Sequence, residues 1–527
     1  MADDGAHGAA PLAHFPAGDA VGVATGGLHV YRGLPYAMPP VGPLRWRAPV
    51  AMERWAGPRE ATRTEPACIQ PRRRPGSIYD SPLGRTDEDC LCLNVWAPAD
   101  ARDLPVFVWI HGGSFIWGSS AEEIYDGSAL AARGAVVVSI NYRLGVFGYF
   151  AHGGLSSRSS EGISGNYGLL DQIAALEWVR RNISAVGGDP TNVTLAGESA
   201  GALSVLCLMA APAASGLFQR AIAQSAYMIS LPALSHDQDG LYAAEAEGER
   251  LAARLGGLAS MLEMDAQTLA DEALRAGFSP SPVLDGVHLE RQLVDIFERG
   301  DQAEVPLLAG YNSGEIRSLP VLVPKLPDTA EGYETEIRAR YGDLATRFLA
   351  LYPSSDMVES TLASIRDALY GWTALKLVET QKAAGLPAYL YLFDHDYPAA
   401  VDAGLRGFHA CELPYLFGTM KRTPPLWPQV PDTQSEADLS RAIGDLWISF
   451  AAGDVPRTGE GVTWPDWTRN GQHIRFAATP EIVDGLSSGM YAFTEEVVRR
   501  RRATGKTPWN WNVGVAAPRP GSEAPAR

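Results

Sequence analysis

The chain has 527 residues, of which 46% are hydrophobic, 20% are charged and 9% are aromatic. This composition is typical of a globular protein with a large core, and it excludes a disordered or collagen-like chain. The formal net charge is -17, which excludes a nucleic-acid partner held through its phosphates. No apolar run approaches the roughly 20 residues that a membrane helix requires, so we expect no membrane span.

The N-terminus and the cysteines bear on the cellular compartment. The first residues, MADDGAHGAA, are acidic where a signal peptide would be basic, and no sustained apolar segment follows them. We therefore expect a cytoplasmic protein on the sequence as given, and a secreted or periplasmic one if a signal has been removed. The five cysteines are too few and wrongly spaced for a zinc site or a disulfide scaffold. The basic runs at 72–74 and 499–502 lack aromatic interleaving, and we interpret both as solvated surface.

The first hundred residues are rich in glycine and proline, which favours short strands and extended loops. From Pro105 onward the pattern alternates between strands and helices. Apolar residues at three- and four-residue spacing predict a helix over 167–186, and a second helix is expected over 200–210. Continuous apolar runs predict buried strands at 105–110, 134–142, 192–197, 220–226, 305–311 and 388–395. This alternation predicts a doubly wound α/β sheet.

The segment Gly197-Glu198-Ser199-Ala200-Gly201 fits the pattern G-x-S-x-G, with a buried strand before it and an apolar helix after it. A serine on such a sharp turn has strained backbone angles. The strand and the helix come so close that the positions two before and two after the serine tolerate almost no side chain. The helix directs its free N–H groups and its positive dipole end at the reacting centre. The pattern predicts a nucleophilic serine, and the alternative is a structural turn.

A second glycine-rich turn, His111-Gly112-Gly113-Ser114, follows the strand predicted at 105–110. An α/β-hydrolase places its second set of oxyanion-binding amides at this point. Glycines there let the backbone approach the substrate oxygen closely. The alternative is a plain glycine turn after a strand.

Eight segments follow one another in the order known from one enzyme family: YRGLPYAMPPVGPLRWRAP, DEDCLCLNVWAP, WIHGGSF, NYRLGVFGYF, GNYGLLDQIAALEWVRRNISAVGGDPTNVTLAGESAGALSV, LAGYNSGE, YLYLFDH and FHACELPYLFG. Over nearly its whole length the chain resembles the type B carboxylesterases, the carboxylesterase/cholinesterase family of α/β-hydrolases. The resemblance implies the α/β-hydrolase fold, with a large, mostly parallel central sheet flanked by helices and with elaborated loops.

The resemblance also selects the residues that would act with Ser199. The family's acid lies in a turn after a strand, which implies Glu315 in GYNSGE, although Gly314 and Ile316 replace the usual Asp and Gly. The family's histidine precedes ELPYLFG, which implies His409. Serine, acid and histidine then occur in the order of this fold. Because the acid raises the pKa of His409 and burial lowers it, we expect activity to rise with pH through an apparent pKa of about 6 to 7.

Further roles follow from the same resemblance. The main-chain N–H groups of Gly113, Ser114 and Ala200 would bind the oxyanion of the transition state. The hydroxyl of Ser114 would narrow the acyl-binding mouth slightly or add a hydrogen bond, since many relatives have glycine or alanine there. Ser225 resembles the family's buried second serine and is a candidate supporting residue, and a plain core serine is the alternative.

The resemblance bears on disulfides and domains as well. Cys68 and Cys90 match the family's first disulfide by position, whereas a cytosolic chain would normally keep them reduced. Because the three triad residues must meet in space, residues 16–514 are expected to form one catalytic domain after an N-terminal tail at 1–15. The low-complexity end, 515–527, is expected to be disordered.

These observations predict a carboxylic-ester hydrolase with a Ser/His/Glu triad, an acyl-enzyme intermediate and no metal or organic cofactor. Its partner is a small-molecule ester, and a monomer is favoured while the oligomeric state stays open. The alternatives are a specialised hydrolase of bulky or toxin-type esters or amides, and a non-catalytic binding protein of the same fold. Glu412 and Asp285 are the alternative acids. The segments 230–280 and 320–370 carry no family signature and are expected to line the substrate pocket.

Overall fold

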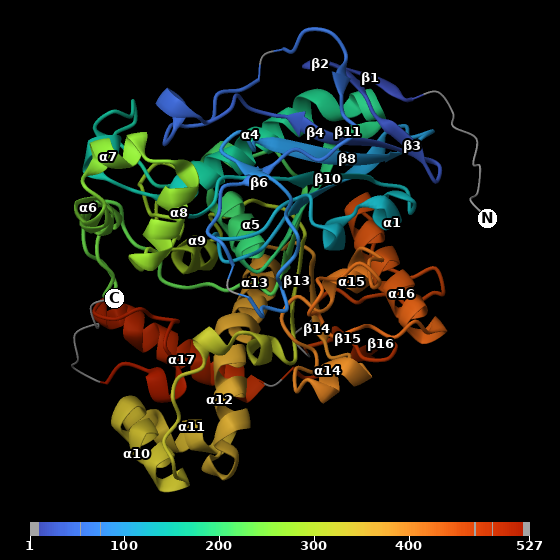
Figure 1. Cartoon of the computed structure of the whole chain (residues 1–527). Helices are drawn as coiled ribbons and strands as arrows, with labels where there is room; N and C mark the ends of the chain where they lie inside the picture. The colour runs from blue at the N-terminus through green and yellow to red at the C-terminus, as the bar shows by residue number, and fades with distance from the viewer. Residues whose placement is uncertain (1–9, 53, 74, 468–470, 487, 520–527) are drawn as a thin grey trace.

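The computed structural model of the chain describes residues 10–52, 54–73, 75–467, 471–486 and 488–519 (Figure 1). Within these residues a mixed sheet of 11 strands forms the centre. Its strands, in spatial order, are β16 (Pro480–Val483), β15 (His473–Phe476), β14 (Ala388–Phe393), β13 (Leu307–Asn312), β12 (Arg220–Gln224), β11 (Gly188–Glu198), β9 (Leu104–Ile110), β10 (Val136–Ile140), β8 (Cys92–Pro98), β4 (Leu28–Pro35) and β3 (Val23–Thr25).

Neighbouring strands from β15 across to β10 are parallel, and the pairs at both edges of the sheet are antiparallel. All six strands predicted from continuous apolar runs are present in this central part. The expected doubly wound, mostly parallel sheet is therefore confirmed.

Strand β9 shows why the sheet is buried on both faces. Val106, Val108 and Ile110 belong to one hydrophobic cluster, and the intervening Phe107 and Trp109 belong to a second cluster. Alternate side chains of a strand point to opposite faces. A run in which every residue is apolar therefore requires a hydrophobic layer on each side of the sheet, and helices supply both layers.

Helices cover the two faces of the sheet (Figure 1). The predicted helix over 167–186 is an α-helix followed by a short 3-10 turn at Ile183–Val186. One cluster joins the sheet to α4 (Tyr167–Asn182), α5 (Ala200–Ala210), α9 (Leu293–Arg299) and α13 (Trp372–Ala383). The other joins it to α1 (Ser128–Ala131), α15 (Leu413–Leu416) and α16 (Gln434–Ala452).

The two segments without a family signature are largely helical. The first contains α6 (Ala244–Arg254), α7 (Leu258–Glu263) and α8 (Ala266–Arg275). The second contains α10 (Ala330–Tyr341), α11 (Ala345–Leu351), α12 (Met357–Arg366) and a π-helical turn, Asp367–Gly371. The remaining helices are α2 (Gly145–Tyr149), α3 (Gly153–Ser156), α14 (Pro398–Asp402) and α17 (Ser488–Thr504).

The structure contains packed residues inside both segments that the sequence predicts to be tails, 1–15 and 515–527. Strand β1 (Leu12–Phe15) pairs with β2 (Gly18–Val21), and the ring of Phe15 packs against Tyr31. At the other end, Val515 and Ala517 are buried in an aromatic cluster. These apolar side chains stabilise the chain ends because they bury surface that a solvated tail would leave in water. Residues 1–9 and 520–527 lie outside the described residues.

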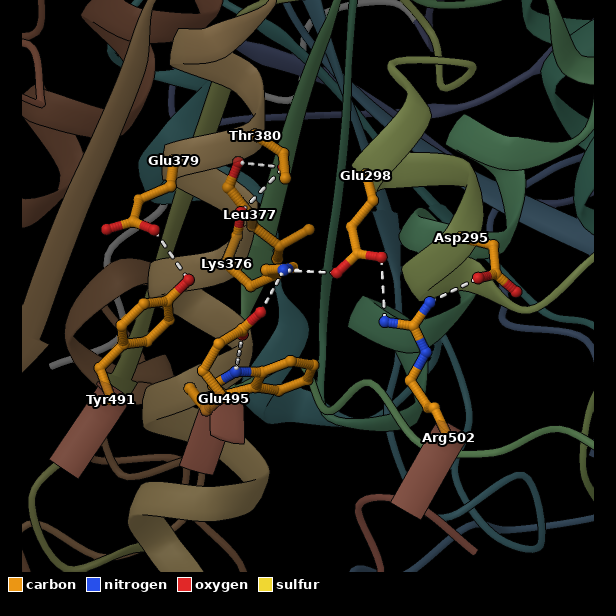
Figure 2. Close-up of polar contacts among 10 residues, drawn as sticks. Asp295, Glu298, Lys376, Leu377, Glu379, Thr380, Tyr491, Glu495 and Arg502 are labelled. Carbon is orange, nitrogen blue, oxygen red and sulfur yellow. Dashed lines mark hydrogen bonds and ion pairs between the residues drawn. The ribbon is translucent and has the colours of Figure 1, made fainter. Parts of the chain in front are cut away.

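Helix α17 is held against α9 and α13 by ion pairs (Figure 2). Lys376 of α13 is buried, and its Nζ lies 2.7 Å from Glu298 of α9 and 2.9 Å from Glu495 of α17. Arg502 of α17 lies 2.9 Å from the same Glu298. In the basic run 499–502, which the sequence predicts to be solvated surface, Arg502 is only partly exposed and pairs with acids of a neighbouring helix.

The described residues include no helix that is long and apolar enough to cross a membrane.

Candidate active site

The candidate residues gather where the parallel strands end. Ser199 follows β11 directly, and Glu315 follows β13. The turn that begins at His111 follows β9. Because β9, β11, β12 and β13 are parallel, their carboxyl ends lie side by side at the same end of the sheet. Open α/β sheets bind their ligands at the carboxyl ends of their strands.

Ser199 has the strained backbone that the G-x-S-x-G pattern predicts. Its φ is 56° and its ψ is -120°, and the next residue begins helix α5. A non-glycine residue persists in such a region only where its surroundings hold it. Here its N–H donates to the carbonyl oxygen of Gln224 at 3.0 Å, and its carbonyl oxygen accepts from the N–H of Leu203 at 2.9 Å. The turn therefore presents the serine at the positive end of a helix.

The two glycines of the pattern are required by close backbone contacts. A Cβ on Gly201 would lie 2.1 Å from the carbonyl oxygen of Ile110, and one on Gly197 would lie 2.5 Å from the carbonyl oxygen of Gly201. Both contacts are shorter than real Cβ atoms show, and both involve main-chain atoms. The prediction that these positions tolerate almost no side chain is confirmed.

His409 and Glu315 meet although they are 94 residues apart in the chain. Nδ1 of His409 donates a hydrogen bond to Oε2 of Glu315, whose Oε1 accepts from the N–H of Asn312 at 2.8 Å. The histidine and the acid are both buried. Because Nδ1 carries the proton of this bond, Nε2 is the nitrogen that can accept a proton.

The departure from the family pattern at Gly314 lies at the contact between the acid turn and the histidine loop. The N–H of Gly314 donates to the carbonyl oxygen of Gly407 at 2.7 Å. A Cβ at this glycine would lie 2.7 Å from the carbonyl oxygen of Leu405 and 2.9 Å from that of Gly407. A side chain at position 314 would push the two loops apart, so glycine suits this chain.

Glu198 is a buried acid beside the histidine that the sequence interpretation missed. Nε2 of His409 lies 3.1 Å from Oε1 of Glu198. Burial raises the pKa of Glu198 to about 8, with the positive charge of His409 opposing the rise. The only sequence signal was its position as the first variable residue of G-x-S-x-G.

The pKa of His409 differs from the sequence-based expectation. Burial lowers it, but the charges of Glu198 and Glu315, together with the hydrogen bond to Glu315, raise it to about 9. The expectation of about 6 to 7 counted one carboxylate, whereas in the structure the charges of Glu198 and, more weakly, Glu412 also raise the pKa. Among the described residues, no hydrogen bond joins His409 to the hydroxyl of Ser199. Nε2 faces the carboxylate of the residue next to the serine.

The predicted oxyanion loop has an unusual backbone. The φ angles are 112° at Gly113 and 58° at Ser114. The N–H of Trp117 donates to the carbonyl oxygen of Gly113 at 2.9 Å, and a Cβ on Gly113 would lie 2.0 Å from the carbonyl oxygen of Trp117. Within the described part of the chain, no protein acceptor takes the N–H of Gly113, Ser114 or Ala200. These three donors are therefore free for a ligand oxygen.

His111 supports this loop and takes no part in the contacts of the triad candidates. Its Nδ1 donates to the carbonyl oxygen of Gly112 at 2.8 Å, and its ring stacks on Tyr142 with a centroid distance of 4.6 Å. Burial lowers its pKa to about 4, so the ring stays neutral at the pH at which proteins usually work.

Ser225 follows β12 and is fully buried with a φ of 49°. Its N–H donates to the carbonyl oxygen of Gly310 at 2.8 Å. Its Oγ has no hydrogen-bond partner among the described residues, so no hydrogen bond of this hydroxyl reaches Ser199, Glu315 or His409. Its supporting role stays a prediction.

Neither alternative acid contacts His409. The carboxylate of Glu412 accepts from the side-chain amides of Asn312 at 2.6 Å and Gln224 at 2.9 Å. Asp285 accepts from main-chain N–H groups of its own turn, including that of His288 at 2.7 Å. Of the three acids considered from the sequence, only Glu315 lies against the histidine.

Two further observations concern cysteines and metals. Cys68 and Cys90 form a disulfide, and Cys92, Cys207 and Cys411 are buried free thiols. Over the part of the chain that the structure describes, no group of three or more His, Cys, Asp or Glu side chains is arranged to hold a metal ion.

Comparison with known proteins decides the family. The model of the carboxylesterase family matches residues 17–494, which is most of the chain. The chain belongs to the carboxylesterase family. Its resemblance to the type B carboxylesterases is therefore confirmed, as are the α/β-hydrolase fold and the assignment as a carboxylic-ester hydrolase. The alternative of a non-catalytic binding protein is not supported.

Relatives of this carboxylesterase include enzymes with different named substrates. It is 35% identical to fumonisin B1 esterase of Sphingopyxis macrogoltabida. The alignment of 487 residues covers 90% of this chain and 87% of the relative. It is 37% identical to para-nitrobenzyl esterase of Bacillus subtilis. That alignment of 461 residues covers 85% of this chain and 91% of the relative.

Solved structures of esterases share the fold. A structure of PNB esterase superposes with a TM-score of 0.79 at 33% identity, covering 92% of this carboxylesterase and 99% of the other chain. A Geobacillus stearothermophilus carboxylesterase gives 0.78 at 32% identity with the same coverage.

Proposed function

We propose that this carboxylesterase hydrolyses esters through Ser199, His409 and Glu315 and a covalent acyl-enzyme intermediate. One observation carries the proposal: a strained serine at a helix N-terminus directly follows Glu198, whose Oε1 lies 3.1 Å from Nε2 of a buried histidine, and the other ring nitrogen of that histidine is bonded to the buried carboxylate of Glu315. This arrangement provides a nucleophile, a general base and a group that orients the base.

In the first step Oγ of Ser199 attacks the carbonyl carbon of the ester, and Nε2 of His409 takes the hydroxyl proton. This step requires the imidazole to face Oγ of Ser199, whereas in the structure its Nε2 faces Glu198, the residue before the serine. The carbonyl oxygen becomes an oxyanion, and the free N–H groups of Gly113, Ser114 and Ala200 bind it. Loss of one such donor typically lowers the rate on the order of 10² to 10³.

The tetrahedral intermediate then breaks its bond to the alkoxy oxygen. His409 gives its proton to that oxygen, so the alcohol leaves and an acyl group stays on Ser199. A water molecule attacks the acyl carbon while His409 takes one of its protons. Return of that proton to Oγ releases the carboxylic acid and restores the enzyme. Glu315 stabilises the imidazolium in both halves of the reaction.

Replacement of the nucleophile tests the mechanism. Ser199→Ala is expected to lower kcat for p-nitrophenyl acetate on the order of 10⁶, with little change in stability because only one oxygen is removed. Ser215→Ala, at an exposed position, is the control and should keep full activity. A sulfonyl fluoride should add one mass label, on the peptide that contains Ser199. Turnover at the wild-type rate by folded Ser199→Ala, or labelling at Ser225 instead, would exclude the triad.

A specialised substrate remains the second candidate, and the likeness to fumonisin B1 esterase favours testing it. The panel would contain p-nitrophenyl esters of increasing acyl length, a p-nitrobenzyl ester, fumonisin B1 and an amide. A specialist should show kcat/KM for one bulky ester that exceeds the value for p-nitrophenyl acetate by orders of magnitude. Similar values across the panel identify a generalist.

A further inference from the structure

Tyr79 contacts both loops that carry the proposed triad, from a third part of the chain. Its hydroxyl oxygen lies 2.9 Å from the main-chain carbonyl oxygen of His409 and 2.7 Å from Oγ of Ser318. Ser318 is the last residue of the 3-10 turn that begins with Glu315. One hydroxyl therefore joins the histidine loop to the acid turn.

The direction of these hydrogen bonds follows from the atoms. The carbonyl oxygen of His409 can only accept, so the single proton of the Tyr79 hydroxyl is donated to it. The hydroxyl of Ser318 then donates to the oxygen of Tyr79. Burial raises the pKa of Tyr79 well above its ordinary value, so the donor keeps its proton throughout the working range of the enzyme.

The ring of Tyr79 is fixed by aromatic contacts on the same side. It packs edge-to-face against Trp427, with centroids 5.8 Å apart, and Trp427 packs against Phe408 at 4.9 Å. Phe408 directly precedes His409. Edge-to-face aromatic pairs are favourable contacts, so movement of the phenol away from the histidine loop would disrupt this packing.

The segment that carries Tyr79 is anchored at its own ends. The disulfide between Cys68 and Cys90 closes it, and the guanidinium of Arg73 donates to the carbonyl oxygen of Tyr79. Near its start, the amide of Gln70 bonds to both the N–H and the carbonyl oxygen of Gly118, at 3.1 and 2.9 Å. The backbone of this segment is therefore held by contacts outside the two loops that Tyr79 joins.

We propose that Tyr79 is a positioning residue for ester hydrolysis, whose hydroxyl holds the main chain of His409 in place against Glu315. The proposal rests on the triad proposed above. Catalytic groups must be held within a fraction of an ångström of their productive geometry. A bond from a disulfide-closed segment provides this restraint without contact to the reacting atoms.

Tyr79→Phe tests the proposal because it removes only the hydroxyl and keeps the aromatic stack. We expect kcat for p-nitrophenyl acetate to fall about 3- to 10-fold, the effect of one hydrogen bond, while KM changes less than about twofold. The rate of inactivation by a sulfonyl fluoride should fall by the same factor. The midpoint of the pH–rate profile should move to lower pH, since a looser His409–Glu315 pair raises the pKa less.

Tyr397→Phe is the matched control. Tyr397 is also buried and donates to a main-chain carbonyl, that of Pro428 at 3.0 Å, but this bond lies outside the two triad loops. The control should lose stability and keep its kcat and pH profile. A second test adds Tyr79→Phe to Glu315→Gln, where it should lower kcat by less than about twofold because its effect acts through that pair.

Three results would overturn the role of Tyr79: an unchanged kcat and pH profile, an effect confined to KM, or an equal loss of kcat in Tyr397→Phe. Additive effects in the double variant would also overturn it. Retained turnover by Ser199→Ala is a different failure. It would contradict the proposed triad itself, and the contact between Tyr79 and His409 would then have no role in catalysis.

Discussion

Nε2 of His409 lies 3.1 Å from Oε1 of Glu198, the residue directly before Ser199. The imidazole therefore has a carboxyl group at each nitrogen, since its Nδ1 is bonded to Glu315. Each carboxylate favours the imidazolium. Because the proposed mechanism requires a neutral imidazole as the base, we expect this geometry to set the pH range of activity.

The pH dependence of activity follows from these charges. Only neutral His409 can take the proton of Ser199, so kcat/KM should rise as pH rises through the pKa of the histidine. These two carboxylates, with a smaller contribution from Glu412, raise that pKa to about 9, so the midpoint should lie above the ordinary histidine value of about 6.5. Because His409 and Glu198 are coupled, the midpoint belongs to the pair. Initial rates from pH 5 to 10 measure it, and a midpoint at or below about 6.5 contradicts the assignment.

Removal of one carboxylate separates the two contributions. Glu198→Gln takes away a negative charge that raises the pKa of His409, so the midpoint should move to lower pH. The same pH–rate series measures this. The control is Glu177→Gln, in the C-terminal half of helix α4, because Glu177 is not among the groups that shift the pKa of His409. Its midpoint should equal that of the wild type. An unchanged midpoint in Glu198→Gln would mean that the carboxyl group of Glu198 is already protonated over the whole pH range in which activity rises.

The assignment of the acid can be tested with a matched pair. Glu315→Gln should lower kcat by roughly 10² to 10⁴, because the amide no longer holds the imidazole in the required tautomer. Glu412→Gln should change kcat by less than about threefold, since its side chain contacts Asn312 and Gln224 and does not contact His409. Steady-state kinetics on p-nitrophenyl acetate decide this. The reverse order of effects would make Glu412 the acid.

Gly201, two residues after the proposed nucleophile, should be essential for folding as well as for activity. Gly201→Ala places a methyl group 2.1 Å from the carbonyl oxygen of Ile110, so helix α5 and strand β9 must separate. We expect a loss of about 3 kcal/mol of stability, the upper end of overpacking effects, and a large fall in kcat. Gly153→Ala is the control, because its Cβ would make only an ordinary contact with Glu249. Equal urea midpoints for the two variants would contradict the close contact.

The buried lysine of Figure 2 should matter for stability and not for chemistry. Lys376→Met leaves the carboxylates of Glu298 and Glu495 without their shared cation. Because these acids are partly exposed, the loss should be about 2 kcal/mol, below the value for a fully buried pair. Lys421→Met breaks an exposed pair with Asp432 and should lose less than about 1 kcal/mol. Urea unfolding measures both, and kcat of both should match the wild type.

Much of the site could be predicted from local sequence because its constraints are local. The turn at Ser199 requires glycine at 197 and 201, since strand and helix are joined by a single residue there. The continuous apolar strands likewise predict a sheet covered on both faces, because alternate side chains must each be buried. His409 and Glu315 were reached only through the family resemblance, since nothing in their spacing relates two residues that are 94 positions apart.

Only the tertiary structure decided which side chains surround the histidine. Glu198 belongs to the G-x-S-x-G motif, but its contact with His409 depends on how the histidine loop returns to the carboxyl ends of the parallel strands. Tyr79 has no motif, and its position depends on a disulfide-closed segment that crosses two other loops. The chain ends behave in the same way, since Val515 is held by an aromatic cluster formed by distant helices. Sequence patterns report the neighbours of a residue along the chain, whereas pKa values and positioning depend on its neighbours in space.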